Sequence, residues 1–418
     1  MLKFDIVVVG GGFAGTAAAI AAGRSGCSVL LVERGNSLGG AASNGLVNPF
    51  MPNRTVLGDA PEETELSQGI FAEIVKKLKE MDAMKESGVF HEEYLKLLLN
   101  RMALEANANL LYHSYLIDVN KDNGKIGSII VANKSGKMEI FADYFIDATG
   151  DADLAVLSGC PYRLGRESDN LCQPMTLCFR VANVDLEKYK AVKETITPLY
   201  NQMQKQGKIK NVREDVLIFH NIVDGVLHFN STRIVKRNPV DAFDLTKAEI
   251  EAREQVFELF EFMKNNIDGF QNAQLLMTGS AIGVRESRMI EGEYVLTGED
   301  LISCKKFEDS IAIGNYDIDI HNPEGSGTSH YYFPKGQYYT IPYRSLLPKN
   351  VDNLLVTGRC ISVTHEAQAS IRIMPIVCCL GEAAGVAASI ASKNNISVKE
   401  IDIMQLREQL LERGAKIS

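Results

Sequence analysis

The chain has 418 residues, of which 45% are hydrophobic and 23% charged, and these ordinary values exclude a disordered or fibrous protein. This length predicts two domains, or one large domain that carries an inserted one. The formal net charge of −9, without a basic run interleaved with aromatics, argues against nucleic acid as a partner.

The apolar segment 6–22 has neither the pattern of a signal peptide nor that of a membrane helix. Glycines interrupt it, and only five residues, ending in Asp5, precede it. No other stretch approaches the roughly 20 apolar residues that a membrane helix needs. The eight cysteines include no Cys-x-x-Cys pair, which excludes a thioredoxin-type disulfide and a four-cysteine metal site. We therefore expect a cytoplasmic protein with reduced thiols and no membrane span.

The N-terminal elements follow the order strand, helix, strand. Residues 4–9 (FDIVVV) form a continuous apolar run that stops at glycines, and residues 13–26 are rich in alanine. Residues 27–33 (CSVLLVE) are again apolar throughout, as in a parallel sheet that is covered on both faces.

Two helices and a meander of strands come next. Segments 65–81 and 91–107 carry apolar residues at helical spacing. Segment 109–150 alternates short apolar runs with Asp-Asn-Gly and Ser-Gly turns, which predicts strands that return to the main sheet.

The pattern changes in the second half of the chain. From about 160 to 340, long polar stretches mix with strands and one clear helix near 245–266, and this region is the candidate substrate domain. A short apolar strand (NLLVTG, 353–358) follows, and two helices, 376–393 and 399–413, end the chain.

Residues 10–15 (GGGFAG) fit the pattern G-x-G-x-x-G directly after a strand and at the start of a helix. Gly10 permits the tight turn, Gly12 lets the backbone approach a pyrophosphate, and Gly15 allows close packing of helix and strand. Glu33 ends the second strand 23 residues after Gly10, where its carboxylate can accept hydrogen bonds from an adenosine ribose. These features predict dinucleotide binding.

Three further segments bear on which dinucleotide is bound. Segment 38–45 (LGGAASNG) is a loop of small residues that would let the backbone run close to a pyrophosphate and a flavin ring. Segment 146–151 (IDATGD) is a strand that ends in Ala-Thr-Gly-Asp, and segment 353–359 (NLLVTGR) is a strand before an alanine-rich helix.

Together these segments resemble the FAD-dependent oxidoreductases whose flavin domain is shared with glutathione reductase-like and succinate dehydrogenase-like flavoproteins. The resemblance spans both ends of the chain and is most specific in its C-terminal half. There, segments 282–288 (IGVRESR), 317–321 (DIDIH), 341–359 and 365–388 are similar to one bacterial family whose members are described as FAD-dependent oxidoreductases.

The resemblance implies FAD as cofactor and assigns residues to its parts. It places the pyrophosphate at the glycine turn, the adenosine ribose at Glu33, the adenine at the backbone of Leu116 on the strand after the 91–107 helix, and the ribityl chain near residues 40–42 and 358–359. The candidate cofactor-binding residues are Gly10, Gly12, Phe13, Ala14, Gly15, Glu33, Arg34, Gly40, Ala41, Ala42, Gly45, Leu116, Thr149, Gly150, Asp151, Gly358, Arg359, Ile373 and Met374.

The chain departs from the wider superfamily at Arg359. Many relatives carry an aspartate after the glycine of this strand, where it binds a ribityl hydroxyl, so the role of Arg359 stays open. The helix that begins near Met374 and Pro375 would direct its N-terminal dipole at the pyrimidine edge of the flavin, where negative charge collects on reduction.

Candidate catalytic residues are those that could move a proton or orient a substrate beside a flavin. His365 and Arg372 come first because they lie between the last strand and the helix that approaches the ring. Arg285, Arg288 and His321 of the candidate substrate domain come second. The alternative for each is a structural role, since arginines commonly pair with carboxylates.

Other chemistries lack their motifs. The histidines show neither H-x-x-x-H nor H-E-x-x-H, so no metal site is expected, and no Gly-x-Ser-x-Gly motif indicates a hydrolase. No second G-x-G-x-x-G lies between a strand and a helix. We therefore expect an organic substrate to reduce the flavin and an unidentified acceptor to reoxidise it.

The sequence predicts an α/β fold: a Rossmann-like FAD-binding domain with a parallel sheet and a β-meander, plus an inserted α+β substrate domain. The expected boundaries are 1–160 and 341–418 for the FAD-binding domain and 161–340 for the substrate domain. The predicted function is a dehydrogenase that moves a hydride between a small polar molecule and flavin N5. The alternatives are a non-catalytic FAD-binding redox sensor and a flavoprotein of cofactor or tRNA modification. The sequence is also compatible with an oligomer.

Overall fold

The computed structural model describes residues 2–58 and 61–418. Its largest element is a seven-stranded sheet in the order β5-β2-β1-β8-β7-β6, with β19 also paired to β8. The parallel strands are β1 (Lys3–Val9), β2 (Val29–Val32), β5 (Ala108–Leu111), β8 (Gly136–Asp147) and β19 (Leu354–Val356). The antiparallel strands are β6 (Tyr115–Asp122) and β7 (Lys125–Asn133).

The long strand β8 joins the two parts of this sheet. Its first half pairs antiparallel with β7, and its last residues pair parallel with β1 and with β19. The parallel sheet with its meander confirms the predicted fold class. It also brings the ends of β1, β8 and β19 to one edge, where ligands bind in such sheets.

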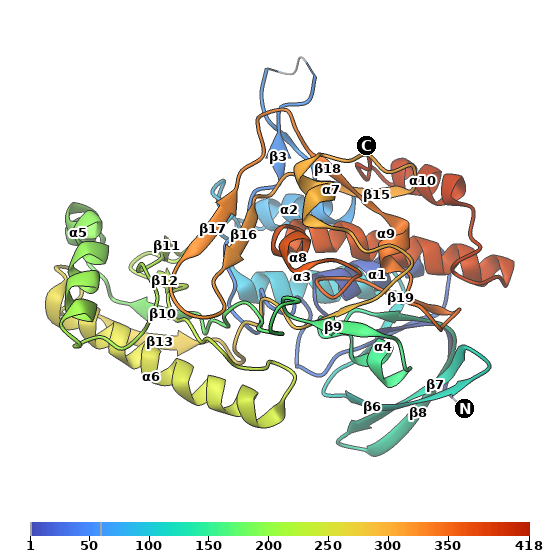
Figure 1. The fold of residues 1–418 in the computed structure, drawn as a ribbon, viewed down its shortest axis with the longest axis horizontal. Coiled ribbons are helices and arrows are strands. Elements are labelled where there is room, and N and C mark those ends of the chain that lie inside the picture. Colours follow the sequence, from blue (N-terminus) through green and yellow to red (C-terminus); the bar gives the residue numbers. More distant parts are fainter. Residues whose placement is uncertain (1, 59–60) are drawn as a thin grey trace.

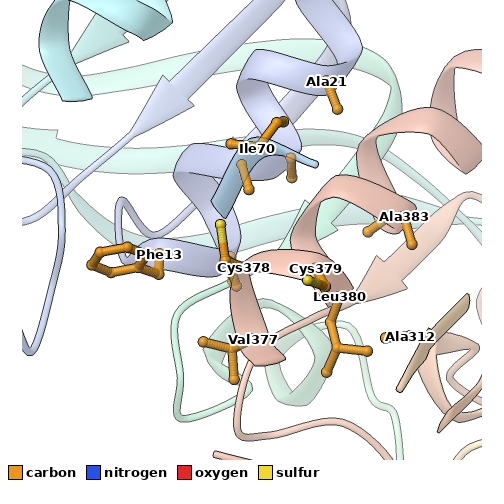
Figure 2. Close-up of a cluster of buried hydrophobic side chains, with 14 of the residues drawn as sticks. Phe13, Ala21, Ile70, Ala312, Val377, Cys378, Cys379, Leu380 and Ala383 are labelled. Atoms are coloured by element: carbon orange, nitrogen blue, oxygen red, sulfur yellow. The ribbon is translucent and has the colours of Figure 1, made fainter. Parts of the chain in front are cut away.

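Two helices cover one face of the sheet and pack closely on each other: α1 (Phe13–Arg24) and α9 (Met374–Asn394). A Cβ atom on Gly381 would lie 2.0 Å from the carbonyl oxygen of Ala14, so only glycine permits this approach. Figure 2 shows α9 side chains such as Cys378 within the buried cluster that also holds Phe13 and Ile70.

Helix α9 is long and apolar enough to span a membrane, with a mean hydropathy of 1.7 over its most apolar window. The expectation that no stretch beyond residues 6–22 approaches the length of a membrane helix was therefore wrong by length and composition. In the structure 94% of that window is buried, because the helix packs between α1, the sheet and neighbouring strands.

A second, separate core lies to one side of the main sheet (Figure 1). It consists of a four-stranded antiparallel sheet in the order β11-β12-β10-β13 and two long helices. These elements are β10 (Phe179–Ala182), β11 (Ile218–His220), β12 (Leu227–Phe229), β13 (Gln274–Thr278), α5 (Leu186–Lys205) and α6 (Ala242–Asn266).

Short elements connect the two cores. The hairpin of β16 (Ile318–His321) and β17 (Thr328–Tyr331) lies between the main sheet with its helices and the second core (Figure 1). The remaining strands are β3 (Arg54–Thr55), β4 (Thr64–Glu65), β9 (Tyr162–Leu164), β14 (Arg288–Ile290), β15 (Ser310–Gly314) and β18 (Tyr339–Pro342). The remaining helices are α2 (Ile70–Glu80), α3 (Glu92–Glu105), α4 (Asp153–Leu157), α7 (Gly298–Ile302), η1 (Tyr343–Leu346), α8 (His365–Ile371) and α10 (Ile403–Glu412).

Helix α5 was not predicted, because it lies in the region from about 160 to 340 that was interpreted as long polar stretches, and because the helix buries few side chains. Only Tyr189, Ile196 and Tyr200 are buried along its 20 residues, and it contains Pro198. The predicted helix 65–81 begins later, at Ile70, because Gly69 has a φ of 63°. All eight cysteines lie among the described residues; they are unpaired, and all but Cys304 are buried.

Candidate active site

The glycine turn after β1 leaves room for a ligand at one position and is closely packed at the others. A Cβ atom on Gly15 would lie 1.8 Å from the carbonyl oxygen of Gly10, so helix and turn can meet only without a side chain. A Cβ atom on Gly12 would meet no atom of the described residues within 4 Å. The turn is therefore open toward solvent at Gly12, where the motif places the pyrophosphate.

Glu33 and the loop 38–45 are both attached to this turn. The carboxylate of Glu33 accepts hydrogen bonds from the backbone amides of Gly11 and Gly35, each at 2.6 Å. The amide of Gly39 donates to the carbonyl of Gly11 at 2.8 Å, and a Cβ atom on Gly40 would lie 2.9 Å from Cα of Gly12. Backbone contacts thus hold both segments beside the open position.

The ends of β8 and β19 meet through an ion pair. Arg359 donates from Nη2 to Oδ1 of Asp151 at 2.8 Å, and Ser287 donates to the same oxygen at 2.6 Å. Burial would raise the pKa of Asp151, but Arg359, the Ser287 hydrogen bond and the charge of Arg34 lower it overall. Arg359 therefore lies across the face of Gly150, where a Cβ atom would be 3.1 Å from its guanidinium.

The other candidate cofactor-binding residues lie in varied surroundings. Phe13 points into the core, with its ring 5.4 Å from that of Phe50, so only its backbone faces the turn. Leu116 is half-buried on β6, one strand later than the strand that directly follows α3. Thr149 donates to Asp147 within its own turn. Three more of these residues, Ala41, Ile373 and Met374, line the cavity described next. The remaining small residues are Ala14, Ala42, Gly45 and Gly358.

A cavity of about 1180 Å³ is lined by residues of the main-sheet part of the chain and by residues of the second core. Its wall includes Ala41 from the loop 38–45 and Ile373 and Met374 at the start of α9, so the N-terminus of α9 opens into it. Of the five candidate catalytic residues, Arg285, His321 and Arg372 line this cavity. Arg359 also contributes to its wall.

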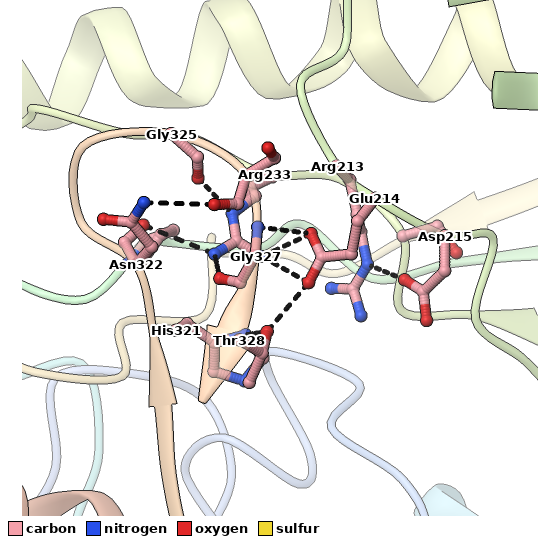
Figure 3. Close-up of polar contacts among 12 residues, drawn as sticks. Arg213, Glu214, Asp215, Arg233, His321, Asn322, Gly325, Gly327 and Thr328 are labelled. Atoms are coloured by element: carbon pink, nitrogen blue, oxygen red, sulfur yellow. Dashed lines mark hydrogen bonds and ion pairs between the residues drawn. The ribbon is translucent and has the colours of Figure 1, made fainter. Parts of the chain in front are cut away.

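His321 belongs to a chain of hydrogen bonds that Figure 3 displays. Its Nδ1 lies 3.1 Å from Oγ1 of Thr328, whose hydroxyl donates to Oε1 of Glu214 at 2.8 Å. On the other side of the ring, Nε2 lies 3.4 Å from Oδ2 of Asp319. Burial and the positive charge of Arg285 lower the pKa of His321 to about 3, so the ring is neutral at neutral pH.

Arg233 holds this chain in place from the second core. Its buried guanidinium donates to the carboxylate of Glu214 and to the carbonyl of Gly327 at 2.6 Å, in the turn of the β16–β17 hairpin (Figure 3). Burial alone would raise the pKa of Glu214, but hydrogen bonds, including that of Thr328, and the charge of Arg233 lower it to about 2. Glu214 is thus ionised and can only accept hydrogen bonds.

His365 and Arg288 do not line the cavity. His365 begins α8 and is buried, with Nδ1 2.7 Å from Oε1 of Glu286. The other carboxylate oxygen of Glu286, Oε2, accepts from the amide of Gln173. Arg288 pairs with Asp153 and donates to the carbonyl of Asp151 at 2.6 Å. Arg288 thus connects β14 to the segment that follows β8, whereas His365 connects α8 to the segment before β14.

The sequence analysis did not name several polar residues of the cavity. Asp319 alternates with His321 along β16, and this two-residue spacing was a usable signal that both face the same side. Arg213 and Glu214 carried no such signal, because they lie in a loop that tertiary packing brings to the first residue of β17, Thr328. Tyr316 also lines the cavity, and its hydroxyl donates to Asp319 at 3.3 Å.

Comparison with known proteins identifies the family. Residues 5–410 match the family model described as FAD dependent oxidoreductase. The chain belongs to this family. Its cofactor is FAD. The open position at Gly12 fits the phosphates of FAD, and the carboxylate of Glu33 fits the ribose. The N-terminus of α9 fits the flavin ring.

Individual relatives share less of the chain. A thiamine thiazole synthase from Methanococcus aeolicus is 33% identical over 166 residues, which cover 37% of this chain and 58% of that protein. A digeranylgeranylglycerophospholipid reductase 2 from Methanothermobacter thermautotrophicus is 27% identical over 195 residues, which cover 44% of this chain and 49% of that protein. The chain spans about half the length of the curated relatives it matches.

Solved structures resemble the chain at low identity. A geranylgeranyl bacteriochlorophyll reductase-like protein from Thermoplasma acidophilum is 14% identical with a TM-score of 0.46, over 100% of this chain and 85% of that one. The flavin-dependent brominase Bmp2 is 13% identical with a TM-score of 0.47, over 98% of this chain and 83% of that one. At these scores the likeness carries no argument about function.

Proposed function

We propose that the protein is a dehydrogenase that moves a hydride between a small polar organic substrate and N5 of FAD. The observation that carries this proposal is the cavity itself. Its lining includes residues expected beside the flavin ring, Ile373 and Met374, together with His321, Arg285 and Asp319. A substrate in this space would touch both the cofactor and the groups that can orient it and take its proton.

When bound, FAD supplies the hydride acceptor. The chain must then position the substrate and accept the proton that leaves with the hydride. Arg372 is placed to orient the substrate, because its Nη2 is fixed on the carbonyl of Asp319 at 3.0 Å while its buried Nη1 has no hydrogen-bond partner in the part of the chain that the structure describes.

The hydrogen bonds of Thr328 make Nε2 of His321 the proton acceptor. Ionised Glu214 cannot donate, so the Thr328 hydroxyl proton points to Glu214, and the Thr328 oxygen must accept from His321. Nδ1 of His321 therefore carries the ring proton, and Nε2 keeps its lone pair. After proton transfer, the carboxylate of Asp319, 3.4 Å away, stabilises the positive ring.

We also propose that an external acceptor reoxidises the flavin. The chain carries one dinucleotide motif, at residues 10–15, which the FAD uses.

A role in cofactor synthesis is the second candidate function. The 33% identity to a thiamine thiazole synthase favours it, although that match covers 37% of this chain. Such a role predicts that a biosynthetic precursor, and not a common metabolite, reacts in the cavity.

The direct test is anaerobic titration of the FAD-loaded protein with sugars, hydroxy acids, amino acids and amines. We expect one class to bleach the visible absorption of oxidised flavin. The same compounds are added to the His321→Gln variant as a matched control. If dithionite reduces the flavin and no compound of the panel does, the dehydrogenase proposal is wrong for these classes and the second candidate gains support.

A further inference from the structure

Arg285 is a cation in the cavity wall that forms no ion pair within the described part of the chain. Its Nη1 donates to the carbonyl of Pro174 at 2.7 Å and to Oγ1 of Thr176 at 2.5 Å, and its Nη2 lies 3.5 Å from Oδ1 of Asn230. All three acceptors are neutral. Across residues 2–58 and 61–418, no carboxylate forms an ion pair with this guanidinium.

Four further arginines line the same cavity, and two of them, Arg372 and Arg213, act on the pKa of Arg285. Arg372 has the unpartnered buried Nη1 described above, and its Nη2 lies 3.6 Å from Oδ2 of Asp319. Arg213 donates from Nε to Asp215 at 2.7 Å, and this is the one dashed contact of its guanidinium in Figure 3. The charges of Arg372 and Arg213 add to burial in lowering the pKa of Arg285 to about 9.

The acidic side chains of the cavity are already engaged elsewhere. Asp319 is shared between Arg372 and His321. The other pairs are Glu63 with Arg54, Glu214 with Arg233, Asp215 with Arg213, and Asp317 with His330. None of these carboxylates forms an ion pair with Arg285, and the charge of nearby Asp319 only partly offsets the burial and the two arginine charges that lower the pKa of Arg285. Holding a partly buried cation without a paired counter-charge is unfavourable.

We propose that Arg285 and Arg372 form a subsite for a small oxyanion, a carboxylate or a phosphate group carried by the substrate. Planar guanidinium groups match the oxygen geometry of both anions. The phosphates of FAD do not account for this site, because their position is the glycine turn at Gly12. This inference rests on the proposed dehydrogenase function, because it takes the anionic group to be part of the substrate that the enzyme oxidises.

Anion binding would also affect the proton acceptor. Arg285 and Arg372 both lower the pKa of His321, while Asp319 raises it. An anion that offsets the two arginine charges raises the proton affinity of Nε2 when the substrate is present. The subsite would therefore couple substrate binding to proton transfer.

The test uses the FAD-loaded protein and measures binding by calorimetry and by the change in flavin absorption. The probes are malonate, inorganic phosphate and the uncharged analogue malonamide. We expect malonate or phosphate to bind and malonamide not to. Arg285→Met should weaken anion binding by roughly ten- to hundredfold, the loss of a charge-assisted hydrogen bond. Arg344→Met, an exposed arginine outside the cavity that pairs with Asp309, should leave it unchanged.

Flavin content and melting temperature show whether Arg285→Met is folded, and Arg285→Lys, which keeps the charge, should recover part of the binding. Equal binding of malonate and malonamide, or of malonate to wild type and a folded Arg285→Met variant, overturns the subsite.

Tighter binding of malonate than phosphate identifies a carboxylate, and the reverse identifies a phosphate. Anion binding that depends on Arg285, without any substrate that reduces flavin, keeps the subsite and counts against the dehydrogenase. Flavin reduction by a neutral substrate only, without anion binding, supports the dehydrogenase and overturns the subsite.

Discussion

The cofactor cradle and the substrate cavity of this protein are built in different ways. The cradle consists mainly of backbone: Gly12 is open to the ligand, Gly15 permits close packing, and Gly39 is hydrogen-bonded to the turn. The cavity consists of side chains from distant segments, such as Glu214, Arg285 and His321. The cradle is therefore determined within a few contiguous residues, whereas the cavity depends on the packing of one core against the other.

This difference predicts that the two sites fail separately. Changes in the glycine turn should affect folding or FAD affinity, and changes in the cavity should affect the reaction while FAD stays bound. The following variants test that separation.

Gly15→Ala should have the largest effect. Its Cβ atom would lie 1.8 Å from the Gly10 carbonyl, and neither backbone segment can move without separating β1 from α1. We expect destabilisation of at least about 3 kcal/mol and little soluble protein. Expression yield and urea unfolding measure it, and a stable Gly15→Ala protein with normal FAD content would contradict the structure of the turn.

His321→Gln should slow flavin reduction by the substrate about 10²- to 10⁴-fold, the usual contribution of a general base. Thr328→Val, which removes the hydroxyl between His321 and Glu214, should slow it about tenfold, and Thr328→Ser should restore the rate. Anaerobic stopped-flow measurements give these rates. An unchanged rate in His321→Gln would show that another group accepts the proton.

Arg233→Met should loosen the β16–β17 hairpin. The buried guanidinium bonds Glu214 and the carbonyl of Gly327, so its loss leaves a carboxylate without its cation and costs about 3 kcal/mol. Thermal unfolding and limited proteolysis near residues 322–328 measure the effect, while FAD affinity should stay within about twofold. Arg344→Met, which breaks an exposed pair, should cost less than about 1 kcal/mol.

Glu382→Gln should give a smaller effect that depends on pH. Glu382 is buried in α9, accepts from the amide of Ile70 at 2.9 Å, and has a pKa that burial raises from 4.5 to about 7. The folded protein therefore binds an extra proton between these values, and its stability falls as pH rises from about 4.5 to about 7. Glu382→Gln should raise the melting temperature by roughly 2 °C at pH 8 and change it little at pH 5. An equal shift at both pH values would refute this assignment.

The sequence allowed prediction of the cradle and of most of the main sheet. Gly10, Gly12, Gly15 and Glu33 follow a fixed spacing that the chemistry of a phosphate turn requires, so local pattern suffices. Helix α5 was missed because its apolar pattern is sparse around Pro198.

The cavity was predictable only in part. Arg285, Arg372 and His321 were named from the C-terminal motifs and do line it, but His365 and Arg288 bond carboxylates outside it. Arg213 and Glu214 could not be found from their own surroundings, because a loop of the second core brings them to the hairpin. Their placement depends on contacts between residues more than 100 positions apart.

The most direct test of the separation between cradle and cavity is FAD affinity, measured by fluorescence titration of the apoprotein for Gly12→Ala and His321→Gln. The Gly12→Ala side chain meets no atom of the described residues, so this variant should fold normally but bind FAD at least about tenfold more weakly, since the methyl group occupies the approach to the pyrophosphate. His321→Gln should bind FAD as wild type does. Wild-type affinity in Gly12→Ala, or a comparable loss in His321→Gln, would contradict the account.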